Sequence, residues 1–490
     1  MFRSIKKIAV VLIGLFSCLI SSSCKKLLEV EAPINSITTK DVFSTDDQAE
    51  MAMAAMYSLM VNSDSYFSNG GVSIAGGLSA DELYAYYGAA QSPLYQLNTN
   101  SLLADNAPTK EIWVSAYNII YLANSIIEGI GESTATTLSV RARKQLTGEA
   151  KFIRALSFFY LTNLFGDVPL ALTVDFNKTQ RMARTPQQQV YNQIIDDLNA
   201  AQSALADDYS ASGVLQERIR PNKWAAIALL ARVHLYLKDY PQALTEAKSV
   251  IDQQGLFDLE DNPDNVFAPT SREAIWQLKQ ATDHPTTRNA TKEGNAFIPS
   301  PWGTGPAFFC ITEQLLNAFE PNDKRRVQWI AQTDNSSVAG MPPGITRFPH
   351  KYKLGLHNSV PGMDPSEYYT GLRLAEMYLI HAEAQANGAG GGPAAAIDDL
   401  NIIRHRADIE LLPAGLTETQ VKAAVEKERQ TELFAEWGHR WLDLKRTGKA
   451  ASMLSQIPLK QPWKGDDQLL YPIPPSELKV NSALKQNKGY

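Results

Sequence analysis

Apolar residues recur at helical spacing through most of this chain. In the segment 149–165, large apolar residues return every three or four positions, and Gly166 and Pro169 follow as stop signals. The segment 224–237 is apolar on nearly every side, which is typical of a helix buried all round. These segments predict a mainly α protein.

Two pairs of helical segments indicate a repeated helix–turn–helix unit. The segment 224–237 is followed by a Lys-Asp-Tyr-Pro break and a second segment at 242–251, and the segments 372–386 and 394–406 are joined by a glycine-rich connection. The first pair has small residues where tetratricopeptide helices cross closely. With a further long helix expected at 418–436, the pattern predicts a tetratricopeptide-like scaffold of helical pairs with long irregular loops and a few short strands.

Two regions interrupt this scaffold. We expect helices at about 40–61, 107–280 and 372–450, and loop-rich regions at about 62–106 and 281–371. The first loop region is rich in Gly, Asn, Ser and Tyr, and the second holds 10 of the 26 prolines, a density that forbids long helices. A short strand is expected at 275–279. Long ordered loops on a rigid scaffold usually carry function, so we expect the binding site there.

The first 23 residues have the pattern of a signal peptide. Three basic residues precede an apolar run at 8–20, which is too short to span a membrane, and three serines then lead into Cys24. A cysteine at that junction is typical of a lipid-anchored protein, in which several acyl chains together hold the chain at the membrane. Ordinary cleavage with a free Cys24, and acylation at Cys18, remain alternatives. Removal of residues 1–23 takes away three positive charges and changes the formal net charge from −6 to −9.

Composition and motifs exclude several classes of function. The acidic net charge disfavours a nucleic-acid partner, and three cysteines give no disulfide framework. The chain has no zinc-protease, nucleophile-elbow or phosphate-loop motif, so we expect no enzyme and no cofactor. A cluster of acidic residues lacks the ligand spacing and the glycine of a calcium-binding EF-hand loop, although calcium remains a minor alternative; the cluster comprises Asp258, Glu260, Asp261 and Asp264.

Glutamates recur on one face of the last long helix. Glu428, Glu432 and Glu436 follow one another at four-residue intervals, where like charges repel. We expect nearby arginines to pair with them in a structural network, and we name Arg440 as the buried partner of Glu432. A ligand site and a solvated face are the alternatives.

Five blocks resemble the SusD/RagB family in order along the chain. They are the segment from Gly148 to Leu170, the segment from Ala228 to Tyr240, the segment from Arg373 to Glu383, the segment from Glu428 to Arg446, and the closing Leu-Tyr-Pro-Ile-Pro-Pro with the terminal Gln-Asn-Lys-Gly-Tyr. The resemblance implies a non-catalytic outer-membrane lipoprotein that captures nutrient oligomers for a TonB-dependent, SusC-like transporter. Its ligand would be a glycan oligomer, or less often a peptide, and a lipid-anchored glycoside hydrolase is a more distant alternative.

Aromatic and polar residues of the two loop regions form the expected ligand site. Aromatic ring faces stack on sugar C–H groups, and sugar hydroxyls need polar partners once they lose water. We therefore expect ligand contacts from Asp81, Tyr84, Tyr86, Tyr87, Tyr95, Asn98 and Trp302. Trp113 and Trp224 lie on helical faces and are expected in the core.

Overall fold

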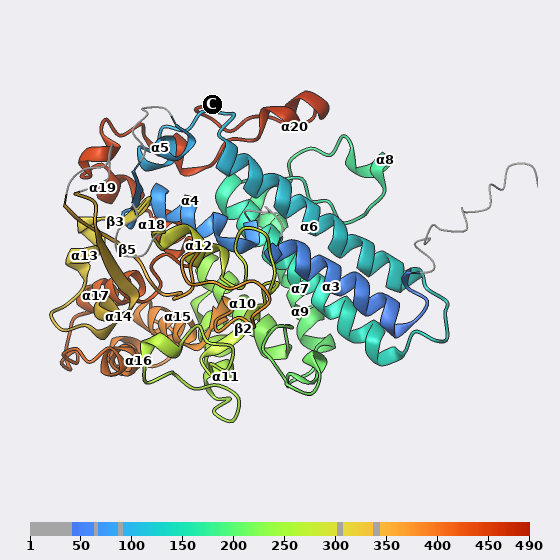
Figure 1. Cartoon of the computed structure of the whole chain (residues 1–490), viewed down its shortest axis with the longest axis horizontal. Helices are drawn as coiled ribbons and strands as arrows, with labels where there is room; N and C mark the ends of the chain where they lie inside the picture. Colours follow the sequence, from blue (N-terminus) through green and yellow to red (C-terminus); the bar gives the residue numbers. More distant parts are fainter. Residues whose placement is uncertain (1–41, 63–66, 87–91, 301–306, 337–343) are drawn as a thin grey trace, which may run out of the picture.

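The protein is mainly helical in the computed structural model, which describes residues 42–62, 67–86, 92–300, 307–336 and 344–490 (Figure 1). Within the described residues, nine long helices form the scaffold: α3 (Asp46–Asn62), α6 (Ala107–Glu132), α7 (Val140–Phe165), α9 (Gln187–Ala204), α10 (Lys223–Tyr236), α11 (Tyr240–Ile251), α15 (Leu374–Ala386), α16 (Gly392–Arg406) and α17 (Glu418–Glu432). In chain order, each helix from α6 to α11 packs on the next long helix, α11 packs on α15, and α15 packs on α16 and α17. The predicted scaffold of helical pairs is confirmed.

Helix boundaries follow local signals in the sequence. Ser139 caps the first turn of α7, and Gly166 ends that helix with a φ of 78°, which side chains other than glycine rarely adopt. Thr417 opens α17 with a capping box. We expected α17 to continue to Glu436, but it ends at Glu432 because Ala435 and Trp437 take positive φ values that leave the helix.

Shorter helices complete the chain. They are α4 (Val72–Ser79), α5 (Pro93–Asn98), α8 (Phe176–Thr179), α12 (Lys292–Phe297), α13 (Glu313–Ala318), α14 (Lys324–Trp329), α18 (His439–Arg446), α19 (Ala450–Leu454) and α20 (Pro475–Val480). The prediction that the first loop region contains no helix is wrong, because α4 lies within it as a helix in which every residue except Ile74 is buried. In the second loop region the helices are only six residues long, in keeping with its proline content.

Three antiparallel pairs of strands make up the β structure of the described residues. β1 (Leu83–Ala85) pairs with β3 (Phe309–Ile311), β2 (Ala274–Leu278) pairs with β6 (Tyr369–Arg373), and β4 (Ile330–Asp334) pairs with β5 (Ile345–Pro349). The strand expected at 275–279 is confirmed as β2. Residue 372, expected at the start of a helix, belongs instead to β6.

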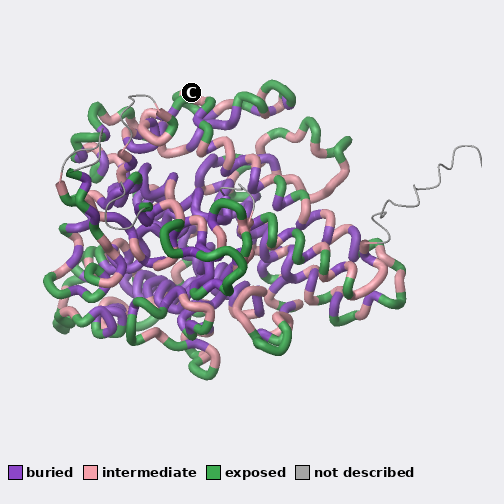
Figure 2. The backbone as a smooth tube through the Cα atoms, viewed as in Figure 1, coloured by how far each residue is buried: buried purple, intermediate pink, exposed green. Residues whose placement is uncertain are grey.

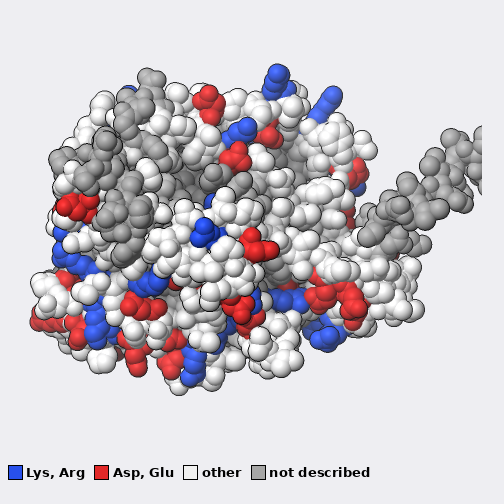
Figure 3. All heavy atoms as spheres, viewed as in Figure 1, with Lys and Arg blue, Asp and Glu red and all other residues white. Residues whose placement is uncertain are grey.

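The core runs along the helical scaffold. Figure 2 shows buried backbone through the middle of the molecule and exposed backbone mainly in the outer turns. Trp113 is 2% exposed and belongs to the core, as expected, whereas Trp224 is only partly buried and packs at its edge. No helix of the described residues is long and apolar enough to cross a membrane. In Figure 3, charged side chains of both signs gather along the lower edge, where Figure 1 places α11 and α16.

The C-terminal segment closes the end of α7. The backbone N–H of Tyr471 donates to the carbonyl oxygen of Leu164 at 2.8 Å, and the Asn487 amide donates to the carbonyl oxygen of Phe165 at 2.9 Å. The last carbonyl groups of a helix have no partner within the helix. The final residues of the chain therefore complete a helix that was begun more than 300 positions earlier.

Candidate functional site

The two loop regions meet at the pair of strands β1 and β3. Tyr84 lies opposite Cys310 in this ladder, and beyond it the backbone N–H of Tyr86 donates to the carbonyl oxygen of Phe308 at 2.9 Å. β5 packs against β3 and extends this small β layer. Segments more than 200 residues apart in the sequence are thereby paired, and the two regions in which the site is expected lie side by side here.

The buried helix α4 fixes the position of this surface. Gly76 of α4 crosses Gly438 at the start of α18 so closely that a Cβ atom on Gly76 would lie 2.6 Å from the Gly438 Cα. Only glycine permits this approach of two backbones. The glycines that made this region look like a loop in the sequence are therefore the reason that a helix packs there.

A cavity of about 490 Å³ lies beside the β1–β3 pair. Its walls come from α4, the first turns of α5 and α6, α12 and strand β3, which Figure 1 shows grouped in one part of the molecule. The lining is mostly apolar, with Ile74, Leu94 and Phe309 among its larger side chains, and Ser92 and Glu111 add polar groups. Its volume is in the range of small-molecule sites. Sequence analysis missed these apolar residues; Pro93 and Leu94 within a polar, tyrosine-rich segment were the available signal.

The predicted tyrosines lie around this surface in different environments. Tyr84 is half-buried against the small core of Ile298 and Cys310, and its burial raises the pKa of the phenol. Tyr86 and Tyr95 are partly exposed, and Tyr95 lies on α5. The remaining two aromatic residues of the expected site, Tyr87 and Trp302, lie outside the described residues.

Asp81 and Asn98 are occupied by contacts within the protein. The Asp81 carboxylate accepts two hydrogen bonds from the Arg440 guanidinium, both at 2.7 Å, and Asp81 is 2% exposed. The Asn98 side chain bonds both the N–H and the carbonyl oxygen of Ala85, at 2.9 and 2.7 Å. These two residues were expected to contact ligand, but their buried polar atoms instead hold β1 and α18 in place.

Next to Asp81, a second carboxyl group is held in its neutral form. Burial raises the pKa of Glu82 to about 8, and the neighbouring charge of Asp81 adds to the shift. One of the two adjacent acids therefore carries the charge that pairs with Arg440, while Glu82 stays protonated at neutral pH.

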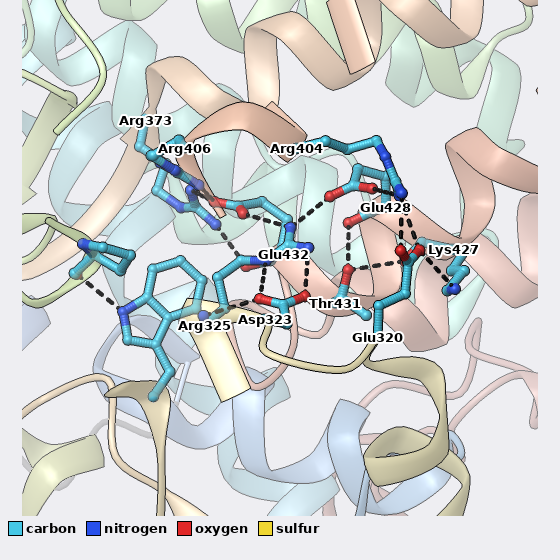
Figure 4. Close-up of polar contacts among 12 residues, drawn as sticks. Glu320, Asp323, Arg325, Arg373, Arg404, Arg406, Lys427, Glu428, Thr431 and Glu432 are labelled. Atoms are coloured by element: carbon cyan, nitrogen blue, oxygen red, sulfur yellow. Dashed lines mark hydrogen bonds and ion pairs between the residues drawn. The ribbon is translucent and has the colours of Figure 1, made fainter. Parts of the chain in front are cut away.

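The glutamates of α17 form a buried network, but with partners that we did not predict. Glu432 is 0% exposed and accepts hydrogen bonds from Arg325 at 3.0 Å, from Arg373 at 2.6 Å, and from Arg406 (Figure 4). The prediction that Arg440 pairs with Glu432 is wrong, because Arg440 lies on α18 against Asp81. The structural role expected for this network is supported by its complete burial.

Neighbouring acids extend the network in two directions. Glu428 accepts from Arg325 at 2.6 Å and from Arg404 at 3.2 Å. Glu436 accepts from Arg373 and from Lys351, whose ammonium group lies 4.1 Å from the centre of the Phe434 ring. The arginines keep the pKa of Glu432 well below its usual value despite the burial, which opposes this effect.

His439, the first residue of α18, is neutral. Burial lowers the pKa of His439 to about 4, and the nearby guanidinium groups of Arg232 and Arg429 act in the same direction. The imidazole is 4% exposed, so protonation would place an additional charge in the core.

No group of three or more potential metal ligands occurs among the described residues. The acidic cluster considered for calcium is divided among other partners. Asp264 pairs with Lys353 at 2.8 Å, and Glu260 accepts from the backbone of Arg272 at 2.7 Å.

Two family matches account for most of the chain. The family described as starch-binding associating with outer membrane matches residues 28–235, and the family described as SusD family matches residues 344–490. The two matches follow one another along the chain in the same order as the five blocks that resemble the SusD/RagB family. The chain belongs to the SusD family.

Curated relatives support this assignment along the whole chain. SusD-like protein P25 from Formosa agariphila is 26% identical, with 99% of each chain covered, and SusD-like protein P2 from the same organism is 27% identical, with 81% of this chain and 83% of the relative covered. Among solved structures, a SusD superfamily protein from Bacteroides vulgatus superposes with a TM-score of 0.77 over 91% of this chain and 100% of that one, at 21% identity. A laminarin-binding SusD-like protein superposes with a TM-score of 0.74 at 24% identity, over 91% of this chain and all of its own.

Family membership fixes the general character of the protein. SusD family proteins are binding proteins and not enzymes, and the matched family is associated with the outer membrane. For this SusD family protein, the cavity beside β1 and β3 is the candidate place of binding.

Proposed function

We propose that this protein captures glycan oligomers at the outer-membrane surface and passes them to a TonB-dependent transporter. The observation that carries the proposal is the junction of both loop regions at β1 and β3, beside a cavity of about 490 Å³. Partly exposed tyrosines border the same junction. Aromatic faces beside a largely apolar hollow suit the C–H faces of neutral sugars.

Two similar structures favour a glycan over a peptide. One is the laminarin-binding SusD-like protein, and another is a surface glycan-binding protein A from Bacteroides fluxus, with a TM-score of 0.72 and 24% identity. The helical fold is shared with both proteins. A peptide ligand remains the alternative within the family.

The proposed attachment to the membrane is a lipid at Cys24, the residue that follows the signal-peptide pattern. Both the signal peptide at 1–23 and Cys24 lie outside the described residues. A lipid at this position would leave the domain at 24–490 free to close over a transporter of the SusC type. The transporter itself is implied by the family resemblance.

The ligand class is tested by titrating the purified protein with laminarin oligosaccharides and with a panel of other glycans and peptides. Binding without release of reducing sugar supports capture, whereas turnover of any glycan would identify a glycoside hydrolase. Saturable binding of peptides alone would replace the glycan proposal.

The location of the site is tested with Trp302→Ala and Tyr86→Ala against the control Tyr121→Ala. Tyr121 is 56% exposed on α6, outside the cavity beside β1 and β3. Loss of a central aromatic anchor costs about 2 kcal/mol or more, or roughly a 30-fold loss of affinity. We expect this loss for Trp302→Ala and an unchanged affinity for Tyr121→Ala. Unchanged affinity with a lower melting temperature for Trp302→Ala would show that this ring packs in the protein and that the ligand binds elsewhere.

A further inference from the structure

The cavity beside β1 and β3 offers few free hydrogen-bonding groups to a sugar. Among the described residues, four polar side chains line it: Asn69, Ser92, Glu111 and Lys292. Asn69 and Lys292 already have partners. The Ser92 hydroxyl caps α5 by accepting from the backbone N–H of Tyr95 at 3.2 Å. A sugar ring inside the cavity would therefore leave most of its hydroxyl groups unpaired after they lose water, which opposes binding.

Glu111 on α6 is the exception among these four side chains. Its carboxylate lines the cavity and forms no hydrogen bond or ion pair with any residue that the structure describes. An ionised carboxylate accepts hydrogen bonds and donates none, so it can take a donor from a ligand. Lys292 lines the same cavity with the opposite charge, so the lining is formally neutral. A neutral ligand with an O–H or N–H donor fits this combination.

The remaining wall of the cavity is largely apolar. The Phe309 ring is buried and meets the Phe297 ring edge-on, with the ring centres 5.8 Å apart. Ile74 and Leu94 pack against the main core and line the same cavity. Apolar walls favour an apolar ligand, and a volume of about 490 Å³ is much larger than a single acetyl group fills. The cavity therefore has room for an aromatic ring with a short side chain.

We propose that this cavity holds a hydroxylated aromatic acyl group, of the hydroxycinnamoyl ester class, carried by the captured glycan. The aromatic ring packs against the apolar wall that includes Phe309, and its phenolic O–H donates to the Glu111 carboxylate. The sugar chain then lies outside the cavity, beside the partly exposed Tyr86 and Tyr95. The inference rests on the proposed capture of glycans and adds the class of substituent that the cavity accepts.

The contact with Glu111 is tested with two small esters that differ only in the phenolic hydroxyl, methyl 4-hydroxycinnamate and methyl cinnamate. Calorimetry compares the full-length protein with Glu111→Ala and with the control Glu132→Ala, which removes an exposed glutamate at the end of the same helix. We expect the hydroxylated ester to bind about 10-fold more tightly to the unaltered protein and to Glu132→Ala, and the two esters to bind Glu111→Ala equally. Equal affinities of the two esters for the unaltered protein would overturn the role of the phenol.

The place of binding is tested by filling the cavity. Ala296→Phe on α12 adds a ring to the cavity wall, whereas Ala55→Phe makes the same change on the exposed face of α3. We expect both esters to bind Ala296→Phe at least about 10-fold more weakly, and Ala55→Phe like the unaltered protein. Melting temperatures of the variants separate loss of binding from loss of folding. Unchanged affinities for a folded Ala296→Phe would overturn the assignment of the esters to this cavity.

The glycan is then tested with laminarin oligosaccharides that carry one 4-hydroxycinnamoyl ester and with the same chains after removal of the ester. Burial of the aromatic group should make the esterified chains bind about 10-fold to 100-fold more tightly. Equal binding of the two kinds of chain, with no saturable binding of methyl 4-hydroxycinnamate, would overturn this inference and leave the capture of glycans intact. Binding of the small ester when no glycan binds would instead overturn the proposed function and leave the class of group in the cavity intact.

Discussion

Removal of the Glu432 side chain tests the buried network in the most direct way. In Glu432→Ala, Arg325 keeps Asp323 and Glu428, and Arg373 keeps Glu273 and Glu436, so two of the three arginines retain two acidic partners each. Arg406 retains only Glu273, at 2.7 Å, and its Nε already lacks a partner among the described residues. Loss of one partner of a buried pair costs about 3–5 kcal/mol, and the remaining contacts place this variant near 3 kcal/mol.

That free energy corresponds to a modest change in melting temperature. The entropy of unfolding of a chain of 490 residues is about 1 kcal/mol per degree, so the midpoint should fall by about 3 °C. Glu418→Ala on the same helix is the matched control: Glu418 is 63% exposed in its pair with Lys422, and its loss should change the midpoint by less than about 0.5 °C. Calorimetry of both variants measures the difference. Equal midpoints for Glu432→Ala and Glu418→Ala would refute the account of the network as a stabilising core.

Three further outcomes are expected. Gly76→Ala should lower the midpoint by about 1–3 °C, because its new Cβ meets the backbone of Gly438. Gly131→Ala, near the end of α6 and with no atom within 4 Å of the added Cβ, is the control and should be neutral or stabilising. Similar shifts for the two variants would contradict the close crossing of α4 and Gly438. His439→Gln should remove part of the fall in the free energy of unfolding on acidification. The pKa of His439 is about 4 in the folded state and about 6.5 in the unfolded state, so between those pH values only the unfolded state gains this proton. An unchanged dependence of stability on pH would mean that the imidazole is already charged in the folded protein. Cys24→Ala should abolish labelling by fatty acid and release the protein from membranes, and persistent labelling would indicate acylation at Cys18.

The helical scaffold could be predicted because its signals are local. The segment 224–237 lies within one residue of α10 at each end, and the expected start of α17 coincides with the capping box at Thr417. The buried helix α4 could not be predicted in this way. Its glycines are usual in loops, and their role depends on Gly438, which lies more than 350 residues later in the chain.

The partners of the buried charged residues could not be predicted from the local sequence either. The four-residue spacing of the glutamates gave their common face, but Arg325 lies 107 positions from Glu432 and only the tertiary fold brings the two together. At the candidate site, the tyrosine-rich composition and the proline-rich segment directed the prediction to the two regions that meet at β1 and β3. The same composition did not distinguish Asp81 and Asn98, which hold the backbone in place, from partly exposed residues such as Tyr86.

The ion pair between Asp81 and Arg440 can form only after most of the chain has been synthesised. At about 5–20 residues per second, the 359 positions between them take roughly 20 to 70 seconds to make. During that interval the carboxylate lacks its guanidinium, α4 lacks the glycine that it crosses, and α7 lacks the tail that completes its last turn. The first third of the chain therefore cannot reach its final packing before the last residues of the chain have been made.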